Sequence, residues 1–421
     1  MHHKITRLKN GLTVATAEMP HMASVCVGLW VGVGGRHESP PLNGVCHFIE
    51  HMLFKGTKKR SSRAISEAVE GIGGYLNAFT TEENTCFYSR AHASKFDELL
   101  DVLTDMVLNS TFDPAEIDKE RNVIKEEVAM YLDQPHVQVQ ELLNETIWPD
   151  HPLGRPLTGT IKTLDTLGRV EMVAYLRQHY VAPATQIVVA GNITHAEVLR
   201  SVNRIARKFP EGRRPTFVPA SNGQAEPRVR LLSKKTEQTQ IDLGIRVCSR
   251  HDNNRYALRV LNALLGENMS SRLFQVVRED NGLAYSISSG LTYFDDTGLL
   301  SIAAGVETEK LEKALKLIVK QIQILKETPP TMAELRRARD YLIGQFDLGL
   351  EGTENQMTWA GEQLLGYGKI PDPVEVKDRL HEVKPSEVRD VARAYFHSKH
   401  INLALVSPMK KADGLERLLK L

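Results

Sequence analysis

YLRQHYVAPATQIVVAGN (residues 175–192) indicates the end of a helix with an aromatic side chain, a short break and then a buried strand. A second stretch, VARAYFHSKHINLALVSP (residues 391–408), contains the same elements in the same order. Self-similarity between segments this far apart is typical of a duplicated structural unit. The two stretches therefore predict that the chain consists of two copies of one fold.

Two further pairs of segments support the duplication. Residues 94–128 and 309–346 each indicate a long helix, a turn that contains proline and a second helix. Strands with alternating apolar residues precede both pairs of helices, at residues 23–35 and 239–249. Helices that follow one another, instead of alternating strictly with strands, favour antiparallel or mixed sheets. We expect an α+β fold with two homologous domains, each a mainly antiparallel sheet packed with helices.

A segment between the two copies has the composition of a linker. Residues 209–230, FPEGRRPTFVPASNGQAEPRVR, are rich in proline, glycine and charge. We therefore place the first domain at residues 1–212, the linker at 213–228 and the second domain at 229–421. Each domain has about 200 residues, which is within the normal size of a domain.

The composition excludes several classes of protein. Of the 421 residues, 42% are hydrophobic and 25% are charged, as in ordinary globular proteins. The formal net charge of +1 argues against a nucleic-acid partner and against a basic surface that binds membranes. We find no apolar run long enough to span a bilayer and no signal or transit peptide, so we expect a cytoplasmic location. Four scattered cysteines fit a reducing compartment.

The first copy contains GVCHFIEHMLFKGT at residues 44–57, a short apolar helix with three polar side chains that stand out. We expect Asn43 to cap its N-terminus. His47 and His51 are four residues apart, so their side chains project side by side, and Glu50 lies close to both. Two imidazoles on one helical turn are a pair of zinc ligands, and an adjacent carboxylate is suited to act as a general base. The pattern H-x-x-E-H is that of the inverted zinc proteases.

A pair of histidines on a helix is more often solvated or simply hydrogen-bonded, so the motif requires a third ligand elsewhere. The segment from Asp113 to about Leu132 is expected to be a helix whose apolar stripe is flanked by Glu120 and Glu127, while Glu126 points towards solvent. A carboxylate that faces a core is costly unless it is paired or binds a metal. An ion pair is the ordinary explanation of both residues.

Together with the histidine motif, Glu127 is the natural third ligand of a zinc site with one open position. Glu120, two turns earlier, is placed to accept a hydrogen bond from a ligating histidine. The second copy has Gln345 near the position of Glu127 and has no H-x-x-E-H motif. We therefore expect one Zn²⁺ per chain, bound by the first copy.

The chain resembles the pitrilysin/insulinase family of zinc metallopeptidases, in particular the short two-domain branch with bacterial processing proteases and the β subunit of the mitochondrial processing peptidase. Glu127 follows His51 by 76 residues, which is about the spacing of the third ligand in that family. The resemblance covers nearly the whole chain. Besides HFIEH, it rests on GLWVGVGGRHE (28–38), GGYLNAFTTEENTCFY (73–88), ERNVIKEEVAMYLDQP (120–135), HPLGRPLTGT (151–160) and SSRLFQVVREDNGLAYSISS (270–289).

The resemblance also implies substrate-binding residues. Asn77, Ala78 and Phe79 would form an edge strand to which an extended peptide adds as a further strand. Taken alone, this segment predicts an ordinary hairpin. Arg278 and Tyr285 would be the arginine and tyrosine that the second domain brings to the substrate, with Tyr285 assisting the oxyanion. Without the resemblance, an exposed arginine and a core tyrosine are the simpler interpretation.

These expectations combine into a zinc-dependent endopeptidase in which Glu50 transfers protons. By the resemblance, the enzyme would cleave unstructured peptides or presequences inside a closed chamber, completed by a homodimer or by a heterodimer with a metal-free homologue. The alternative is a non-catalytic or structural subunit that binds peptides without cleaving them. The intact set of His47, Glu50, His51 and Glu127 counts against this alternative, since a structural subunit has no need of all four.

Overall fold

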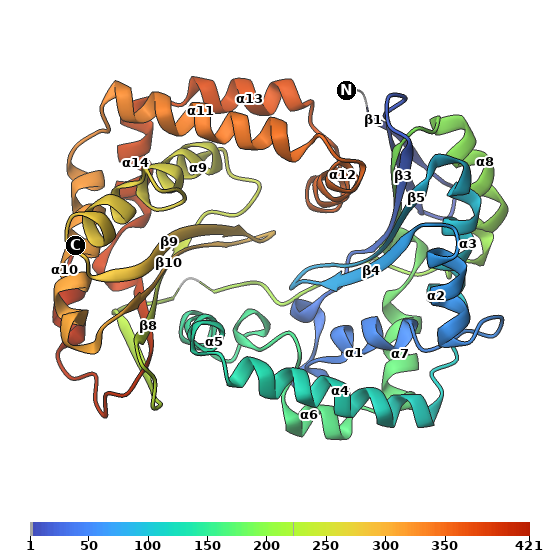
Figure 1. The fold of residues 1–421 in the computed structure, drawn as a ribbon, viewed down its shortest axis with the longest axis horizontal. Helices are drawn as coiled ribbons and strands as arrows, with labels where there is room; N and C mark the ends of the chain where they lie inside the picture. Colours follow the sequence, from blue (N-terminus) through green and yellow to red (C-terminus); the bar gives the residue numbers. More distant parts are fainter. Residues whose placement is uncertain (1–2, 222) are drawn as a thin grey trace. The chain divides into compact units, whose positions relative to one another are not determined.

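The computed structural model describes residues 3–221 and 223–421, which form two compact units (Figure 1). The first unit consists of the chain up to Ala129, Arg155–Val218 and Asp347–Pro373. The second consists of Met130–Gly154, Pro219–Phe346 and Val374–Leu421. Among the described residues, no helix has the length and apolar character needed to cross a membrane.

The first unit is built on a six-stranded sheet that is mainly antiparallel. Its strands, in spatial order, are β1 (His3–Arg7), β2 (Thr13–Glu18), β6 (Thr185–Gly191), β3 (Ser24–Val31), β5 (Thr85–His92) and β4 (Tyr75–Thr80). Only β2 and β6 pair in parallel. The unit's helices are α1 (Val45–Leu53), α2 (Ser62–Glu70), α3 (Phe96–Asn109), most of α4 (Pro114–Leu132), α6 (Ile161–Thr166), α7 (Arg169–His179), α8 (His195–Ile205) and α12 (Thr353–Tyr367).

Both faces of this sheet are covered, which explains why β3 is apolar almost throughout. Val25, Val27 and Leu29 point into the larger core together with residues of α1 and α3. Cys26 and Trp30 point to the opposite face, where α12 packs. Because successive side chains of a strand alternate between faces, a strand buried on both sides has few positions for polar residues.

The second unit repeats this plan with a five-stranded sheet. Its strands, in spatial order, are β7 (Arg228–Ser233), β11 (Ile401–Ser407), β8 (Thr239–Val247), β10 (Gly298–Val306) and β9 (Ala284–Tyr293), and only β7 and β11 are parallel. Its helices are α5 (Pro135–Ile147), α9 (Asn254–Leu265), the short π-helix η7 (Phe274–Glu279), α10 (Leu311–Glu327), most of α11 (Met332–Gly349), α13 (Pro373–Glu382) and α14 (Pro385–Tyr395).

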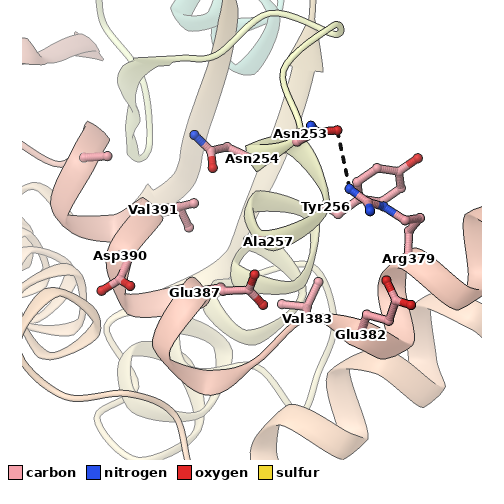
Figure 2. A pocket seen from close by; sticks show the side chains of 11 residues that line it. Asn253, Asn254, Tyr256, Ala257, Arg379, Glu382, Val383, Glu387, Asp390 and Val391 are labelled. Carbon is pink, nitrogen blue, oxygen red and sulfur yellow. Dashed lines mark hydrogen bonds between the residues drawn. The ribbon is translucent and has the colours of Figure 1, made fainter.

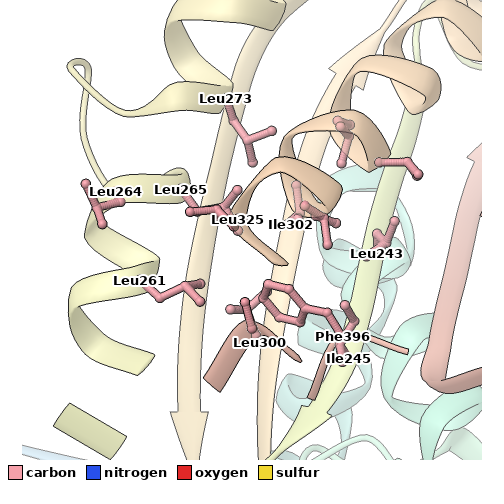
Figure 3. Packing of buried hydrophobic residues seen from close by; sticks show 14 of the residues in the cluster. Leu243, Ile245, Leu261, Leu264, Leu265, Leu273, Leu300, Ile302, Leu325 and Phe396 are labelled. Carbon is pink, nitrogen blue, oxygen red and sulfur yellow. The ribbon is translucent and has the colours of Figure 1, made fainter. Parts of the chain in front are cut away.

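Figure 3 shows the core of the second unit, in which the inner face of the sheet meets the helices. Leu243 and Ile245 of β8, Leu300 and Ile302 of β10 and the ring of Phe396 all lie in this cluster and are fully buried. Two units with mainly antiparallel sheets and covering helices confirm the α+β fold expected from the repeats.

The compact units differ from the continuous ranges 1–212 and 229–421, because two helices are exchanged. Helix α12 comes from the second repeat but packs on β3 and β6 of the first unit, and Figure 1 shows it in orange beside the blue strand β3. Helix α5 comes from the first repeat but packs on β8 and β11 of the second unit. The equivalent strands β3 and β8 have similar apolar patterns, so the sequence does not specify which helix covers which sheet.

Small residues allow α12 to approach its sheet closely. A Cβ added to Gly28 would lie 2.2 Å from Met357 Sδ, and one added to Gly361 would lie 2.2 Å from Trp30 Cε2. Trp30 Nε1 donates a hydrogen bond to Met357 Sδ at 3.3 Å, and Gln186 Nε2 donates to the carbonyl oxygen of Gly361 at 2.6 Å. Glycine is therefore the residue that fits at both contact points.

We expect Gly361→Ala to destabilise the protein. Its methyl group would collide with the buried ring of Trp30, and overpacking of this kind costs roughly 1–3 kcal/mol. This outweighs the gain in helix propensity, which is at most about 1 kcal/mol. The matched control is Gly344→Ala in α11, where an added Cβ would meet nothing within 4 Å. Thermal unfolding should show a lower Tm for Gly361→Ala and an unchanged or higher Tm for the control. Equal Tm changes in the two variants would contradict the close contact.

Candidate metal centre

Helix α1 buries one face in the core and presents His47, Glu50 and His51 on the other. Its start differs from our prediction, because Asn43 does not cap it. The N-cap is Gly44 at φ 93°, and an added Cβ there would lie 2.8 Å from Thr158 O. The buried carboxylate of Glu38 accepts hydrogen bonds from the backbone N–H groups of Gly44 and Cys46, both at 2.8 Å, and from the Asn43 side chain. The carboxylate of Glu38 thus caps the helix in place of the predicted Asn43.

The structure brings His47, His51 and Glu127 together. Glu127 Oε2 lies 3.7 Å from Nε2 of His47 and 3.7 Å from Nε2 of His51. One donor atom from each residue can be chosen so that all three lie within 4.8 Å of one another. Ligand atoms around a tetrahedral zinc ion, with bonds of about 2.0–2.2 Å, are roughly 3.3–3.6 Å apart. Two imidazoles and one carboxylate at these separations fit a zinc ion after small side-chain movements. Glu126 is exposed, as the helix phase predicts.

His47 is in the protonation state that metal binding requires. Burial of its ring, together with the nearby His51, lowers the pKa of His47 to about 4, and Glu127 opposes this only partly. The imidazole is therefore neutral at pH 7, with a lone pair available for a ligand bond.

Glu50 lies beside this group without belonging to it. The hydroxyl of Thr80, the last residue of β4, donates a short hydrogen bond to Glu50 Oε2. Burial raises the pKa of Glu50, while the hydrogen bond from Thr80 and the neighbouring His51 work in the opposite direction. Oε1 has no hydrogen-bond partner among the residues that the structure describes. A carboxylate held by one oxygen and open at the other is suited to exchange a proton.

Glu120 lies behind His51 on α4. His51 Nδ1 is 2.8 Å from Glu120 Oε1, and Lys55 Nζ is 2.6 Å from Glu120 Oε2. Burial acts to raise the pKa of Glu120, but the hydrogen bonds from His51 and Lys55 outweigh it and lower the pKa. An ionised Glu120 accepts a hydrogen bond from the Nδ1–H group of His51, which leaves the lone pair of Nε2 free to bind a metal.

The predicted substrate strand is at the edge of the first sheet. Asn77, Ala78 and Phe79 lie in the middle of β4, which pairs with β5 on one side and is the last strand in the order. The same strand ends at Thr80, whose hydroxyl contacts Glu50. Strand β4 therefore has an unpaired edge within its sheet and leads directly to the candidate base.

Arg278 and Tyr285 belong to the second unit, where they are neighbours. Arg278 lies on η7 with its guanidinium carbon 5.6 Å from the centre of the Tyr285 ring and 4.6 Å from that of Phe274. Tyr285 is the second residue of strand β9 and is 78% exposed. The simpler interpretation of Tyr285 as a core residue is therefore wrong.

Sequence reasoning missed Lys55 and Thr80. Lys55 is four residues after His51, so the same helical spacing that paired the two histidines was a usable signal. Thr80 lies on another element, and no local pattern connects it with Glu50. The contact exists only because β4 packs next to α1.

The second unit offers no comparable metal site in the part of the chain that the structure describes. Figure 2 shows a pocket of about 370 Å³ between α9, α13 and α14. Its lining includes Glu382, Glu387 and Asp390 but neither histidine nor cysteine. Within the described ranges, the one group of three histidine, cysteine or acidic side chains close enough to share an ion is that of His47, His51 and Glu127.

Comparison with known proteins finds relatives that match nearly the whole chain. A family model described as insulinase, peptidase family M16, matches residues 13–161, and one described as the peptidase M16 inactive domain matches residues 166–342. The chain is 37% identical over 400 residues to an uncharacterized zinc protease of Bacillus subtilis, YmxG, covering 95% of this chain and 97% of that protein. An uncharacterized zinc protease of Streptomyces coelicolor is 37% identical over 411 residues, which cover 96% of this chain and 89% of that protein.

Solved structures show the same fold. A crystal structure of a protease from Helicobacter pylori has a TM-score of 0.91 at 21% identity, and the match covers 97% of this chain and 99% of that one. A peptidase M16 inactive domain from Pseudomonas fluorescens has a TM-score of 0.89 at 18% identity, with the same coverage. The family models together match most of the chain, and the relatives are 37% identical over nearly its full length. The chain therefore belongs to the insulinase family of peptidases, family M16.

Proposed function

We propose that this protein is a zinc-dependent endopeptidase with its active site on the first unit. The observation that carries the proposal is the group of His47, His51 and Glu127, with Glu50 held beside it by Thr80. A site that only bound zinc for stability would need a closed set of ligands and no adjacent base. The zinc-protease names of the relatives support the same reaction class.

In the proposed mechanism, His47, His51 and Glu127 would hold one Zn²⁺. When bound, zinc makes water more acidic and polarises the scissile carbonyl. Oε1 of Glu50 takes the proton of the attacking water and later gives it to the leaving amine, while Thr80 keeps Oε2 in place. Proton transfer by a positioned carboxylate contributes typically about 10²–10⁴-fold to the rate.

The proposed substrates are extended, unstructured peptides. A peptide can add to β4 only if its own backbone groups are free, because strand addition is made of main-chain hydrogen bonds. Asn77, Ala78 and Phe79 would give affinity with a loose sequence preference. Arg278 and Tyr285 are proposed to contact the same substrate, and a donor at the oxyanion is worth roughly 10²–10³-fold in rate. The closed chamber and the homodimer or heterodimer expected from the resemblance stay predictions, and sedimentation of the purified chain tests the oligomeric state.

The test of this function combines metal analysis with peptide cleavage. We expect about one zinc per chain, cleavage of an unstructured peptide, loss of cleavage with a chelator and recovery with added zinc. The same peptide sequence locked inside a stable domain should be cleaved little or not at all. Bound zinc without any cleavage would favour the non-catalytic subunit, and equal cleavage of the free and the locked sequence would contradict strand addition.

A further inference from the structure

Lys55 lies next to the candidate metal centre but is not one of its ligands. It follows the end of α1, and its backbone N–H donates to Met52 O at 3.1 Å, which continues the helical turn. Its side chain therefore projects on the same side as that of His51, four residues earlier. Lys55 Nζ lies 2.6 Å from Glu120 Oε2, while Glu120 Oε1 lies 2.8 Å from His51 Nδ1. Lysine, carboxylate and imidazole form one continuous chain of contacts.

The carboxylate of Glu120 is held at two points. Its side chain is only 6% exposed, and each of its oxygens has a different partner. A carboxylate held by one hydrogen bond can still rotate about its last bond, because that torsion is broad and roughly two-fold. A second contact, from Lys55 to Oε2, removes this freedom and keeps Oε1 directed at His51.

The other histidine has no such support. His47 Nδ1 is buried and has no hydrogen-bond partner among the residues that the structure describes. Of the two imidazoles, His51 is thus the one whose ring is oriented by a hydrogen bond to the chain. The geometry of the centre before zinc arrives depends on the contacts of His51, Glu120 and Lys55.

We propose that Lys55 is a positioning residue of the zinc centre: through Glu120 it holds His51 with Nε2 directed at the ion. The inference rests on the proposed zinc site. Loss of an outer partner of a ligating histidine typically weakens metal binding by roughly 10–100-fold. Charge alone predicts the opposite, since removing a cation near Zn²⁺ would strengthen binding. The sign of the change in zinc affinity therefore separates positioning from simple repulsion.

A merely structural ion pair also makes a different prediction. A partly exposed ion pair contributes little to the stability of the fold, and the side chain of Lys55 is 28% exposed. Its loss would lower Tm slightly and leave the zinc affinity and the tautomer of His51 unchanged. Positioning predicts changes in both.

The experiment compares Lys55→Met and Lys55→Gln with Lys55→Arg and with Lys58→Met, in which an exposed lysine three residues later is replaced. The zinc Kd is measured by competition with a chromophoric chelator, and ¹⁵N spectra of the histidine side chains report the tautomer of His51. We expect the zinc Kd to be about 10–100-fold higher for Lys55→Met and Lys55→Gln. We also expect a smaller fraction of His51 to be in the tautomer that is protonated on Nδ1. Lys55→Arg should stay within a few-fold of the wild type, because it keeps a cationic donor, and Lys58→Met should not change.

The outcomes distinguish this inference from the proposed function. Wild-type protein that binds no zinc would overturn both. If the wild type binds zinc and the neutral Lys55 variants bind it just as tightly, only the role of Lys55 is overturned. A tighter Kd in those variants would show that charge repulsion dominates and would overturn it as well.

Discussion

Glu50→Gln is expected to abolish most peptide cleavage while the protein keeps its fold and its zinc. The amide has nearly the same shape and its oxygen can still accept the hydrogen bond from Thr80, but it cannot take a proton from water. Loss of general-base catalysis should lower kcat by roughly 10²–10⁴-fold. Zinc content should be unchanged, because Glu50 is not one of the three ligands.

The measurement is kcat for cleavage of one unstructured peptide by wild-type and variant protein of equal, verified zinc content. Glu70→Gln is the matched control, since Glu70 is an exposed glutamate on the neighbouring helix α2. It should cleave like the wild type. Full activity of a zinc-loaded Glu50→Gln variant would remove Glu50 from the mechanism and leave another group to accept the proton.

Glu127→Gln is expected to lose most of the bound zinc, and Glu126→Gln to lose none. Both changes remove one negative charge from adjacent positions of α4, so they have the same effect on net charge and almost the same effect on the helix. Only Glu127 has its carboxylate between the two histidines, 3.7 Å from each Nε2, whereas Glu126 is exposed. A neutral amide is a poor zinc ligand, because zinc sites favour anionic oxygen, thiolate and imidazole donors.

Zinc titration of the two variants, followed by activity at saturating zinc, decides this prediction. Glu127→Gln should need far more zinc for half-occupancy and should have little activity, while Glu126→Gln should follow the wild-type curve. The reverse pattern would mean that α4 presents the opposite face to the histidines, contrary to the contacts in the structure.

The long helix α4 shows what local sequence signals can specify. Asp113 caps the segment, its side chain accepting from Ala115 N at 2.8 Å, and the helix runs from Pro114 to Leu132 as predicted. Its phase then fixes that Glu120 and Glu127 face inwards and Glu126 outwards. All of this information lies within twenty consecutive residues, so no knowledge of the rest of the chain was needed.

The start of α1 shows why other features were not predictable. A residue of the preferred capping type, Asn43, is present, but the structure uses Glu38 and a left-handed Gly44 instead. The exchange of α5 and α12 between the repeats was likewise not predictable from the local sequence. Several arrangements satisfy the local patterns equally well, and the choice between them is made by packing, such as the fit of Gly361 against Trp30.

The sequence by itself determined the duplicated α+β fold, the helix with His47, Glu50 and His51 on one side, and the inward face of α4. These features follow from the fixed periods of helices and strands, which set the relative direction of side chains within one element. The sequence also predicted Glu127 as the third ligand and Glu120 as the acceptor beside a ligating histidine, but only the tertiary structure brings their carboxylates to the histidines. Tertiary structure alone decided that Thr80 holds Glu50 and that Lys55 contacts Glu120. Side chains on different elements meet only where packing brings the elements together, and no local period encodes that distance.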